Sequence, residues 1–264
     1  MPHTNPSSAT ASPAASLPDL PPPGGLCAIH QPNFFPRLTT LAKLFAADYW
    51  IVLDNVQFSR RDYQHRTRLA ALDNPQQHQW LTIPTRLPRG RQTVIPEALI
   101  VAPVRSRRRC AEMLRQYYGS SPHWPALAAV LPQVLDLFET TDKTAVVAET
   151  STRLLLQMVG WKGQILRSSQ LPARQGRSRR LVDLVAVTGA RSYLCGTGGM
   201  TYLDTSLFTA RGITVTAFTT PATSEWEGGH QISGLRALMR LGPQAFADEL
   251  RTVAIGQTES LPVA

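Results

Sequence analysis

The stretch from 27 to 68, CAIHQPNFFPRLTTLAKLFAADYWIVLDNVQFSRRDYQHRTR, decides the fold of this protein. A short apolar run at 26–29 is followed by a segment, 37–47, whose leucines and phenylalanine recur at helical spacing. A second apolar run, 49–54, is too short for a helix. A strand, a helix and a strand in this order predict a compact βαβ unit with parallel strands and a right-handed crossover.

Two titratable side chains stand at the ends of the two predicted strands. His30 follows the first strand and Asp54 closes the second. The carboxyl ends of parallel strands meet at one edge of the sheet, where ligands of such units collect. We therefore take both residues as catalytic candidates, although each also has a structural interpretation. His30 can be a satisfied core histidine, and Asp54 can form an Asx turn beside Asn55.

Polar and basic residues surround these two positions. Asn33 can cap the helix that follows, and a helix N-terminus beside His30 would attract an anion or depress a pKa. The substrate-binding candidates of this region are Gln31, Asn33, Gln57, Tyr63, Gln64, Arg66 and Arg68. Arg66 and Arg68 can clamp a carboxylate or a phosphate. A run of charges is more often a solvated face, so that alternative stays open.

The rest of the chain continues with strands and helices. Extended pieces are expected at 79–84, 93–101, 164–168, 191–195 and 212–218, and helices at 104–118, 123–138, 143–160, 178–189, 205–210 and 234–252, the last split near Gly242-Pro243. This order predicts an α/β fold of three layers with a mainly parallel sheet, Rossmann-like or nucleotidyltransferase-like. Residues 26–255 are expected to form one domain with a helical lobe at about 103–160. Residues 1–25, rich in Pro, Ala and Ser, and residues 256–264 are expected to be disordered or flexible tails.

A glycine-rich turn follows a predicted strand in SYLCGTGGMTYLD, 192–204. Gly196, Gly198 and Gly199 would let backbone N–H groups approach a ligand closely, but a tight turn without a ligand is an equal alternative. The remaining substrate-binding candidates are Tyr202 and His230. Cys195 is either a nucleophile or, more commonly for a residue at a strand end, a buried structural thiol.

Composition narrows the functional classes. The formal net charge is +9, with 24 arginines and only 3 lysines, which suits an anionic substrate or partner as well as a solvated surface. No zinc-finger, RNP or helix-turn-helix signature occurs, so nucleic acid is disfavoured. The 3 cysteines lack paired spacing, which favours a reduced, cytoplasmic setting, and we expect neither a signal peptide nor a membrane span. We expect no metal site, and the sequence leaves the cofactor unknown.

The motifs, taken in order, resemble the WbqC-like protein family. IHQPNFFP, Lys43, VLDNVQFSRRDYQHRTR, WLTIP and SRRLVDLVAVTGARSYLCGTGGMTYLD carry the resemblance across about 28–218. Ser168 and Ser169, which precede the last of these strings, also fit the later part of the family pattern. The chain departs from the family pattern at His65, where Asn is usual, and in its tail, HQISGLRALMRLG, where a Phe-x-Pro-Asn-Leu-Ser-like stretch is usual.

The resemblance implies a bacterial biosynthetic protein. Family members occur in O-antigen and other biosynthetic gene clusters, and an aminoacyl (glycine) transferase role has been proposed for one. The expected function is therefore transfer of an aminoacyl or acyl group to an amine or sugar, from a small-molecule substrate carried on a carrier protein or a nucleotide. His30 would be the general base and Asp54 would orient it or bind the amine. A nucleotide-dependent ligase or nucleotidyltransferase and a non-catalytic binding partner are the alternatives.

Overall fold

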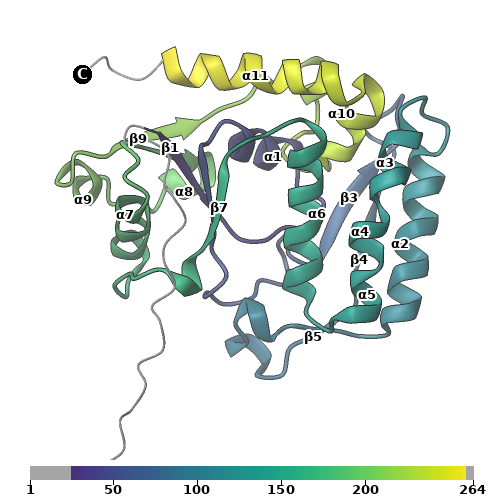
Figure 1. Ribbon diagram of the computed structural model, residues 1–264, viewed down its shortest axis with the longest axis horizontal. Helices are drawn as coiled ribbons and strands as arrows, with labels where there is room; N and C mark the ends of the chain where they lie inside the picture. The colour runs from purple at the N-terminus through teal and green to yellow at the C-terminus, as the bar shows by residue number, and fades with distance from the viewer. Residues whose placement is uncertain (1–24, 260–264) are drawn as a thin grey trace, which may run out of the picture.

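The computed structural model describes residues 25–259 (Figure 1). The strands are β1 (Leu26–His30), β2 (Tyr49–Val52), β3 (Arg66–Ala70), β4 (His78–Thr82), β5 (Thr85–Arg86), β6 (Leu99–Ile100), β7 (Gln164–Arg167), β8 (Ser192–Gly196) and β9 (Thr214–Phe218). The α-helices are α1 (Leu38–Phe45), α2 (Pro103–Tyr118), α3 (Trp124–Val130), α4 (Pro132–Leu135), α5 (Leu137–Thr140), α6 (Thr144–Met158), α7 (Arg177–Val187), α8 (Thr197–Met200), α9 (Ser206–Thr209), α10 (Gly234–Leu241) and α11 (Pro243–Glu259). Short 3-10 helices are η1 (Gly90–Gln92), η2 (Ile95–Glu97), η3 (Ser168–Gln170) and η4 (Ser224–Trp226).

A five-stranded parallel sheet forms the centre of the fold, in the order β7-β2-β1-β8-β9. The predicted βαβ unit is confirmed: β1 pairs with β2 and α1 connects them. After β1, the chain builds outward on one side through β2 and β7. It then returns to the other side of β1 through β8 and β9. This doubly wound arrangement places a topological switch point between β1 and β8, where ligands of open α/β sheets bind.

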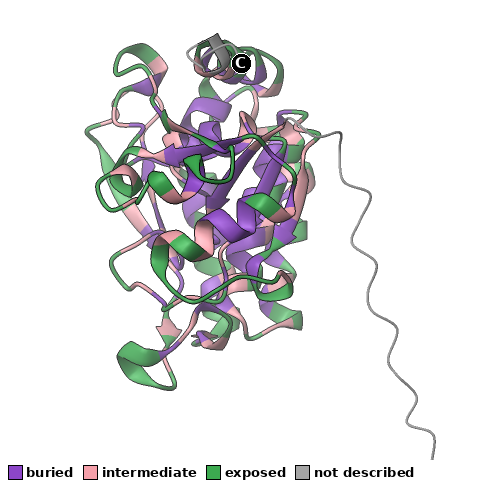
Figure 2. Ribbon diagram, turned by 90° about the vertical axis from the view of Figure 1, so that its left-hand side faces the viewer, coloured by how far each residue is buried: buried purple, intermediate pink, exposed green. Residues whose placement is uncertain are grey.

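Helices cover both faces of the sheet, because alternate strand residues point to opposite sides. Ala28 and Trp50 face the cluster that contains α1, α6, α10 and α11. Ile29 and Ile51 face the smaller cluster that contains residues of α7 and α9. Figure 2 shows the buried segments gathered at the sheet, with exposed ribbon around them. The predicted α/β fold with a mainly parallel sheet is thereby confirmed.

A long insertion separates β2 from β7. It contains the antiparallel pairs β3–β4 and β5–β6 and then the helices α2 to α6. Arg66 and Arg68, which the sequence analysis treated as part of a run of charges, lie in strand β3. The single helix predicted at 123–138 is three short helices, since Pro132 has no backbone N–H to continue the first one. The extended piece predicted at 93–101 contains the three-residue 3-10 helix η2 and has only two residues in β6.

The C-terminal helices confirm the predicted break. Gly242 has a φ of 81°, a conformation that glycine adopts readily, and Pro243 begins α11. Helix α11 runs to Glu259, so it overlaps the flexible tail expected from 256. The remaining tail residues and the expected N-terminal tail, apart from Gly25, lie outside the described residues. Across the described part of the chain, none of the helices has the length and apolarity needed to cross a membrane.

Candidate functional site

A cavity of about 500 Å³ opens at the switch point of the sheet. It lies at the carboxyl ends of β1, β8 and β9, the position where doubly wound sheets bind ligands. Its lining residues are His30, Arg37, Thr39, Thr40, Lys43, Gly196, Thr197, Gly198, Phe218, Thr219, Thr220 and His230. The predicted residues His30, Gly196, Gly198 and His230 therefore meet in one place. Among the described residues that line this cavity, none is acidic.

His30, at the end of β1, is held by hydrogen bonds at both ring nitrogens. Nε2 lies 3.2 Å from Oδ1 of Asn33, and Nδ1 lies 3.4 Å from Nζ of Lys43. The amide of Asn33 donates through Nδ2 to the carbonyl of Pro32, so its Oδ1 is the acceptor toward His30. These partners assign the proton of the neutral imidazole to Nε2 and leave Nδ1 as an acceptor.

The surroundings of His30 favour its neutral form. Burial lowers its pKa well below 6.5, and the positive charges of Lys43 and Arg37 lower it further, while the hydrogen bond that the ring donates to Asn33 opposes the shift. A depressed histidine pKa means that the ring is unprotonated near pH 7. The imidazole can therefore accept a proton in this cavity.

Lys43 is a functional candidate that the sequence reasoning missed. It lies on α1, its residue is 5% exposed, and Nζ donates to the carbonyl oxygen of Ile29 at 3.2 Å. Burial lowers its pKa from 10.5 to about 8, and the charge of Arg37 contributes in the same direction. The signal in the sequence was a lysine inside the apolar pattern of 37–47, in a chain with very few lysines.

Arg37 is the second residue that was missed. It precedes α1, and its guanidinium lies 4.6 Å from the centre of the Tyr63 ring. One terminal nitrogen donates to the carbonyl of His230 at 3.3 Å, whereas its buried Nε has no partner among the described residues. Arg37 thus joins the cavity to the loop that carries His230. The His230 ring itself contacts the Gln231 side chain at 3.0 Å.

The glycine-rich turn after β8 is partly a cavity wall. Gly196 and Gly198 line the cavity, and the turn continues as the short helix α8. Gly199 instead packs against Cys195, because a Cβ on Gly199 would lie 2.7 Å from Sγ. Cys195 is buried, and burial raises its pKa, so its thiol is not an activated nucleophile. Tyr202 is 67% exposed and is not among the residues that line the cavity.

Asp54 lies at the same edge of the sheet as His30 but on the other side of β1. Its Oδ1 accepts from Oγ of Ser168 and from the backbone N–H of Ser169, both at 2.9 Å. Its Oδ2 accepts from Oγ of Ser169 at 2.7 Å. In the described structure its side-chain hydrogen bonds tie β2 to the turn after β7, and those of His30 go to Asn33 and Lys43. The expected contact between Asp54 and His30 is not formed, and a catalytic role for Asp54 stays a prediction.

The glutamines predicted to bind substrate form internal hydrogen bonds. Gln64 donates to Oε1 of Gln31 at 2.6 Å and accepts from the backbone N–H of Ser59 at 3.0 Å. Gln57 donates to the carbonyl of Arg91. These contacts fix the loop between β2 and β3, and none of the three glutamines lines the cavity.

Arg66 and Arg68 lie on the β3–β4 hairpin rather than in the cavity. Their guanidinium groups lie 4.2 and 4.7 Å from the centre of the Trp80 ring, and Tyr63 packs against the same ring at 5.3 Å. Arg68 also donates to the side chain of Gln231, and the Tyr63 hydroxyl donates to the Gln231 carbonyl at 2.8 Å. This stacked group supports the loop that carries His230.

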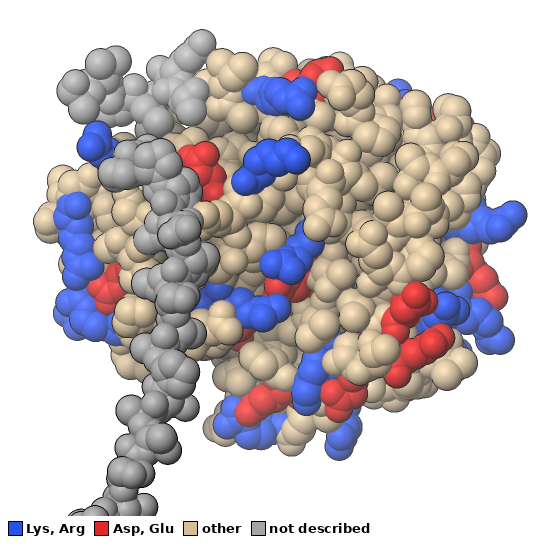
Figure 3. All heavy atoms as spheres, in the orientation of Figure 1, with Lys and Arg blue, Asp and Glu red and all other residues tan. Residues whose placement is uncertain are grey.

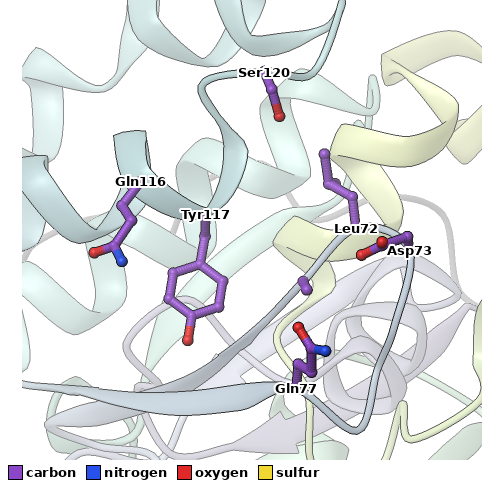
Figure 4. Close-up of a pocket in the computed structure, with 7 residues that line it drawn as sticks. Leu72, Asp73, Gln77, Gln116, Tyr117 and Ser120 are labelled. Carbon is purple, nitrogen blue, oxygen red and sulfur yellow. The ribbon is translucent and has the colours of Figure 1, made fainter.

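Two other features do not coincide with the cavity at the switch point. A second hollow, of about 450 Å³, lies between the β3–β4 turn, with Asp73 and Gln77, and the end of α2, with Gln116 and Tyr117 (Figure 4). It contains none of the predicted site residues. Lys and Arg are spread over the face shown in Figure 3, several beside Asp or Glu, rather than collected in one patch. In residues 25–259, no group of three or more His, Cys, Asp or Glu side chains is placed to hold a metal ion.

Comparisons with known proteins find a distant relative and a matching family model. The chain is 24% identical over 225 residues to an uncharacterized protein of Mycobacterium tuberculosis (strain ATCC 25618 / H37Rv), Rv1507c, covering 83% of this chain and 94% of that protein. No solved structure matches the chain. The model of the WbqC-like protein family matches residues 31–245, which include most of the residues that line the cavity. The chain belongs to the WbqC-like protein family.

Proposed function

We propose that this protein is a biosynthetic transferase that moves an aminoacyl (glycyl) or acyl group onto an amine or a sugar. The observation that carries the proposal is the neutral His30 in the wall of the cavity at the switch point. An unprotonated imidazole can take a proton from an attacking amine or hydroxyl. Membership of the family supports a role in bacterial polysaccharide or natural-product synthesis.

In the proposed reaction, the acceptor nitrogen or oxygen attacks the carbonyl carbon of the donor. A bond forms between them as the bond from the carbonyl carbon to the leaving group breaks. The proton of the attacking atom passes to Nδ1 of His30 and then to the leaving group, which balances the reaction. Asn33 keeps the other ring nitrogen protonated, so Nδ1 is the basic atom. Lys43 donates to Nδ1, so the substrate must draw this ammonium aside.

The turn after β8 supplies donors for the charge that develops on the donor's carbonyl oxygen. Gly196 and Gly198 leave the backbone open to the cavity, and the first N–H groups of α8 have no partner within that helix. Backbone N–H groups and the Thr197 hydroxyl are suitable donors to an oxyanion. Arg66, Arg68 and Asp54 have supporting rather than chemical positions in this proposal.

The test is a turnover screen that is read by mass spectrometry. Purified protein is incubated with glycyl and acyl donors, as thioesters and as nucleotide-activated forms, and with amine and amino-sugar acceptors. The proposal predicts a condensed product for one donor class and its loss in His30→Ala. His78→Ala, which changes an exposed histidine on β4, is the matched control. An active His30→Ala protein would contradict the assignment of the base.

A nucleotide-dependent ligase or nucleotidyltransferase is the second candidate. The doubly wound strand order, with a basic cavity at the switch point, favours it because nucleotides bind at this position in such folds. Product formation that depends on ATP, with release of diphosphate or ADP, would establish this reaction and exclude simple transfer. Product formation without a nucleotide would exclude it.

A further inference from the structure

We infer that the cavity at the switch point is built to bind a phosphate dianion of the substrate, between Lys43 and Arg37. This inference rests on the proposed function, because it names the class of donor: one that carries a phosphate monoester or diphosphate. Three features of the described cavity point to phosphate: a buried cation without a counter-ion, a second cation that is only partly hydrogen-bonded, and a wall without acidic residues.

Lys43 is a buried cation without a counter-ion. Its hydrogen bonds run to the carbonyl of Ile29 and to His30, and among residues 25–259 no carboxylate forms an ion pair with it. A buried ammonium is unfavourable unless it is paired. Two of its three protons have acceptors in the protein, so one remains for a ligand. Nζ lies beside the turn after β8, 4.0 Å from the position of a Cβ on Gly196, and so borders the space that a ligand would occupy.

Arg37 supplies the second positive charge. It too lacks an ion pair within the described chain, and its half-buried guanidinium is held by the ring of Tyr63 and the carbonyl of His230. Its Nε is buried and has no partner among the described residues, and the terminal N–H groups that do not bond to His230 remain as donors. Unlike Arg37, several other arginines, such as Arg107 and Arg174, are paired with carboxylates. The stacked position therefore holds the guanidinium without neutralising it.

The charge of the site matches phosphate better than a carboxylate. Lys43 and Arg37 carry one positive charge each, while His30 is neutral. A phosphate monoester carries about −1.5 to −2 at pH 7, so it neutralises both cations, whereas a carboxylate leaves one of them unpaired. Thr39, Thr40 and Thr197 line the same cavity, and threonine hydroxyls are suitable donors for the remaining phosphate oxygens.

Phosphate binding would also prepare the base. The phosphate oxygens compete with His30 for the protons of Lys43, because they are charged acceptors and form stronger hydrogen bonds. When Lys43 turns to the phosphate, Nδ1 of His30 loses its donor and can accept the proton of the attacking group. One ligand group thus both anchors the donor and frees the base.

The experiment is isothermal titration calorimetry of the full-length protein with inorganic phosphate, pyrophosphate and acetate at constant ionic strength. Wild type is compared with Lys43→Met and Arg37→Gln, and circular dichroism checks that each is folded. Lys162→Met and Arg108→Gln, at exposed positions outside the cavity, are matched controls for the change in net charge. We expect saturable phosphate or pyrophosphate binding that each cavity variant weakens by about 10- to 100-fold, the loss typical of a charged hydrogen bond. The controls should bind as wild type does.

Three results would overturn the inference: no saturable binding of either phosphate, binding that is unchanged in both cavity variants, or acetate binding as tight as phosphate binding. If Lys43→Met does not fold, Arg37→Gln still tests the inference, because the partly buried Arg37 can be replaced with less effect on folding. The titration needs no turnover. A protein that transfers acyl groups through His30 without binding phosphate would therefore refute this inference and leave the proposed function standing.

Discussion

Nζ of Lys43 lies 3.4 Å from Nδ1 of His30. The lysine comes from α1 and the histidine from the end of β1, so the βαβ unit itself brings them together. The neutral His30 accepts a hydrogen bond from the buried ammonium of Lys43. This arrangement is unusual for a lysine, because no carboxylate of the described chain pairs with the ammonium.

Replacing Lys43 by Met should stabilise the folded protein in the absence of added phosphate. The pKa of Lys43 is about 8 in the fold against 10.5 ordinarily, which corresponds to a burial penalty of roughly 3 kcal/mol at neutral pH. Methionine removes this charge and also the hydrogen bond to Ile29, which contributes about 1 kcal/mol. We expect the free energy of unfolding to rise by about 1–2 kcal/mol at pH 7, measured by urea denaturation.

The same variant gives a pH test with a defined sign. Between pH 8 and 10.5 the unfolded chain binds more protons at Lys43 than the folded chain, so this residue makes wild-type stability rise with pH. The advantage of Lys43→Met over wild type should therefore shrink across this window. Other groups titrate there in both proteins and cancel in the difference. A constant difference from pH 7 to 10.5 would mean that Lys43 is not a buried cation.

Phosphate affinity should fall as pH rises from about 7.5 to 9.5. The ammonium of Lys43 loses its proton around its pKa of about 8, and with it one of the two charges of the site. Cys195, Arg37 and Cys27 are the groups whose charges act on Lys43, and His30 contacts it directly. Burial raises the pKa of the Cys27 thiol to about 12 and also raises the pKa of the Cys195 thiol. Titration calorimetry at several pH values checks this. An affinity that stays flat in wild type would contradict it.

Asp54→Ala should reduce stability more than activity. The substitution removes the acceptor of three hydrogen bonds from Ser168 and Ser169, which hold β2 to the turn after β7. We expect a loss of about 1–3 kcal/mol in the free energy of unfolding, with the turnover of the remaining folded protein largely kept. The exposed Asp73 provides a control substitution. A protein of unchanged stability that has lost turnover would restore Asp54 to the chemistry.

Trp80→Ala should loosen the hairpin without removing phosphate binding. The ring of Trp80 holds the guanidinium groups of Arg66 and Arg68 and packs on Tyr63. Its loss should lower the free energy of unfolding by about 1–3 kcal/mol. Phosphate affinity should stay near that of wild type, because Arg37 and Lys43 remain. A large loss of affinity would show that the stacked arginines belong to the ligand site.

Much of the sheet could be predicted, because its strands are short apolar runs joined by helices of clear period. The βαβ unit at 26–54 and the edge position of His30 follow from local patterns alone. Strand β3 was not predicted, because a run of arginines is more typical of a solvated surface than of a strand. They stack on Trp80 of the neighbouring strand, a contact that needs the paired hairpin. Pro132 is a signal for the break between α3 and α4, but the apolar residues of 123–138 favoured one continuous helix.

The candidate site was predicted in part, for a physical reason. The register of parallel strands brings residues at strand ends to one edge, so His30, Gly196 and Gly198 were accessible to sequence reasoning. Which side of β1 holds the cavity depends on the strand order, and the sequence does not state it. Asp54 therefore lies at the same edge but across β1 from the cavity. Lys43 was overlooked because a lysine in a helix is usually solvated, and only its burial reveals its role.

The most direct test of the account compares the rate of acyl or aminoacyl transfer in wild type, His30→Ala and His78→Ala, with melting temperatures measured on the same samples. We expect His30→Ala to lower the rate by about 10²- to 10⁴-fold, the usual contribution of a general base, while its melting temperature stays near that of wild type. His78→Ala should react as wild type does. A His30→Ala protein that is folded and transfers the group at the wild-type rate would contradict the central claim.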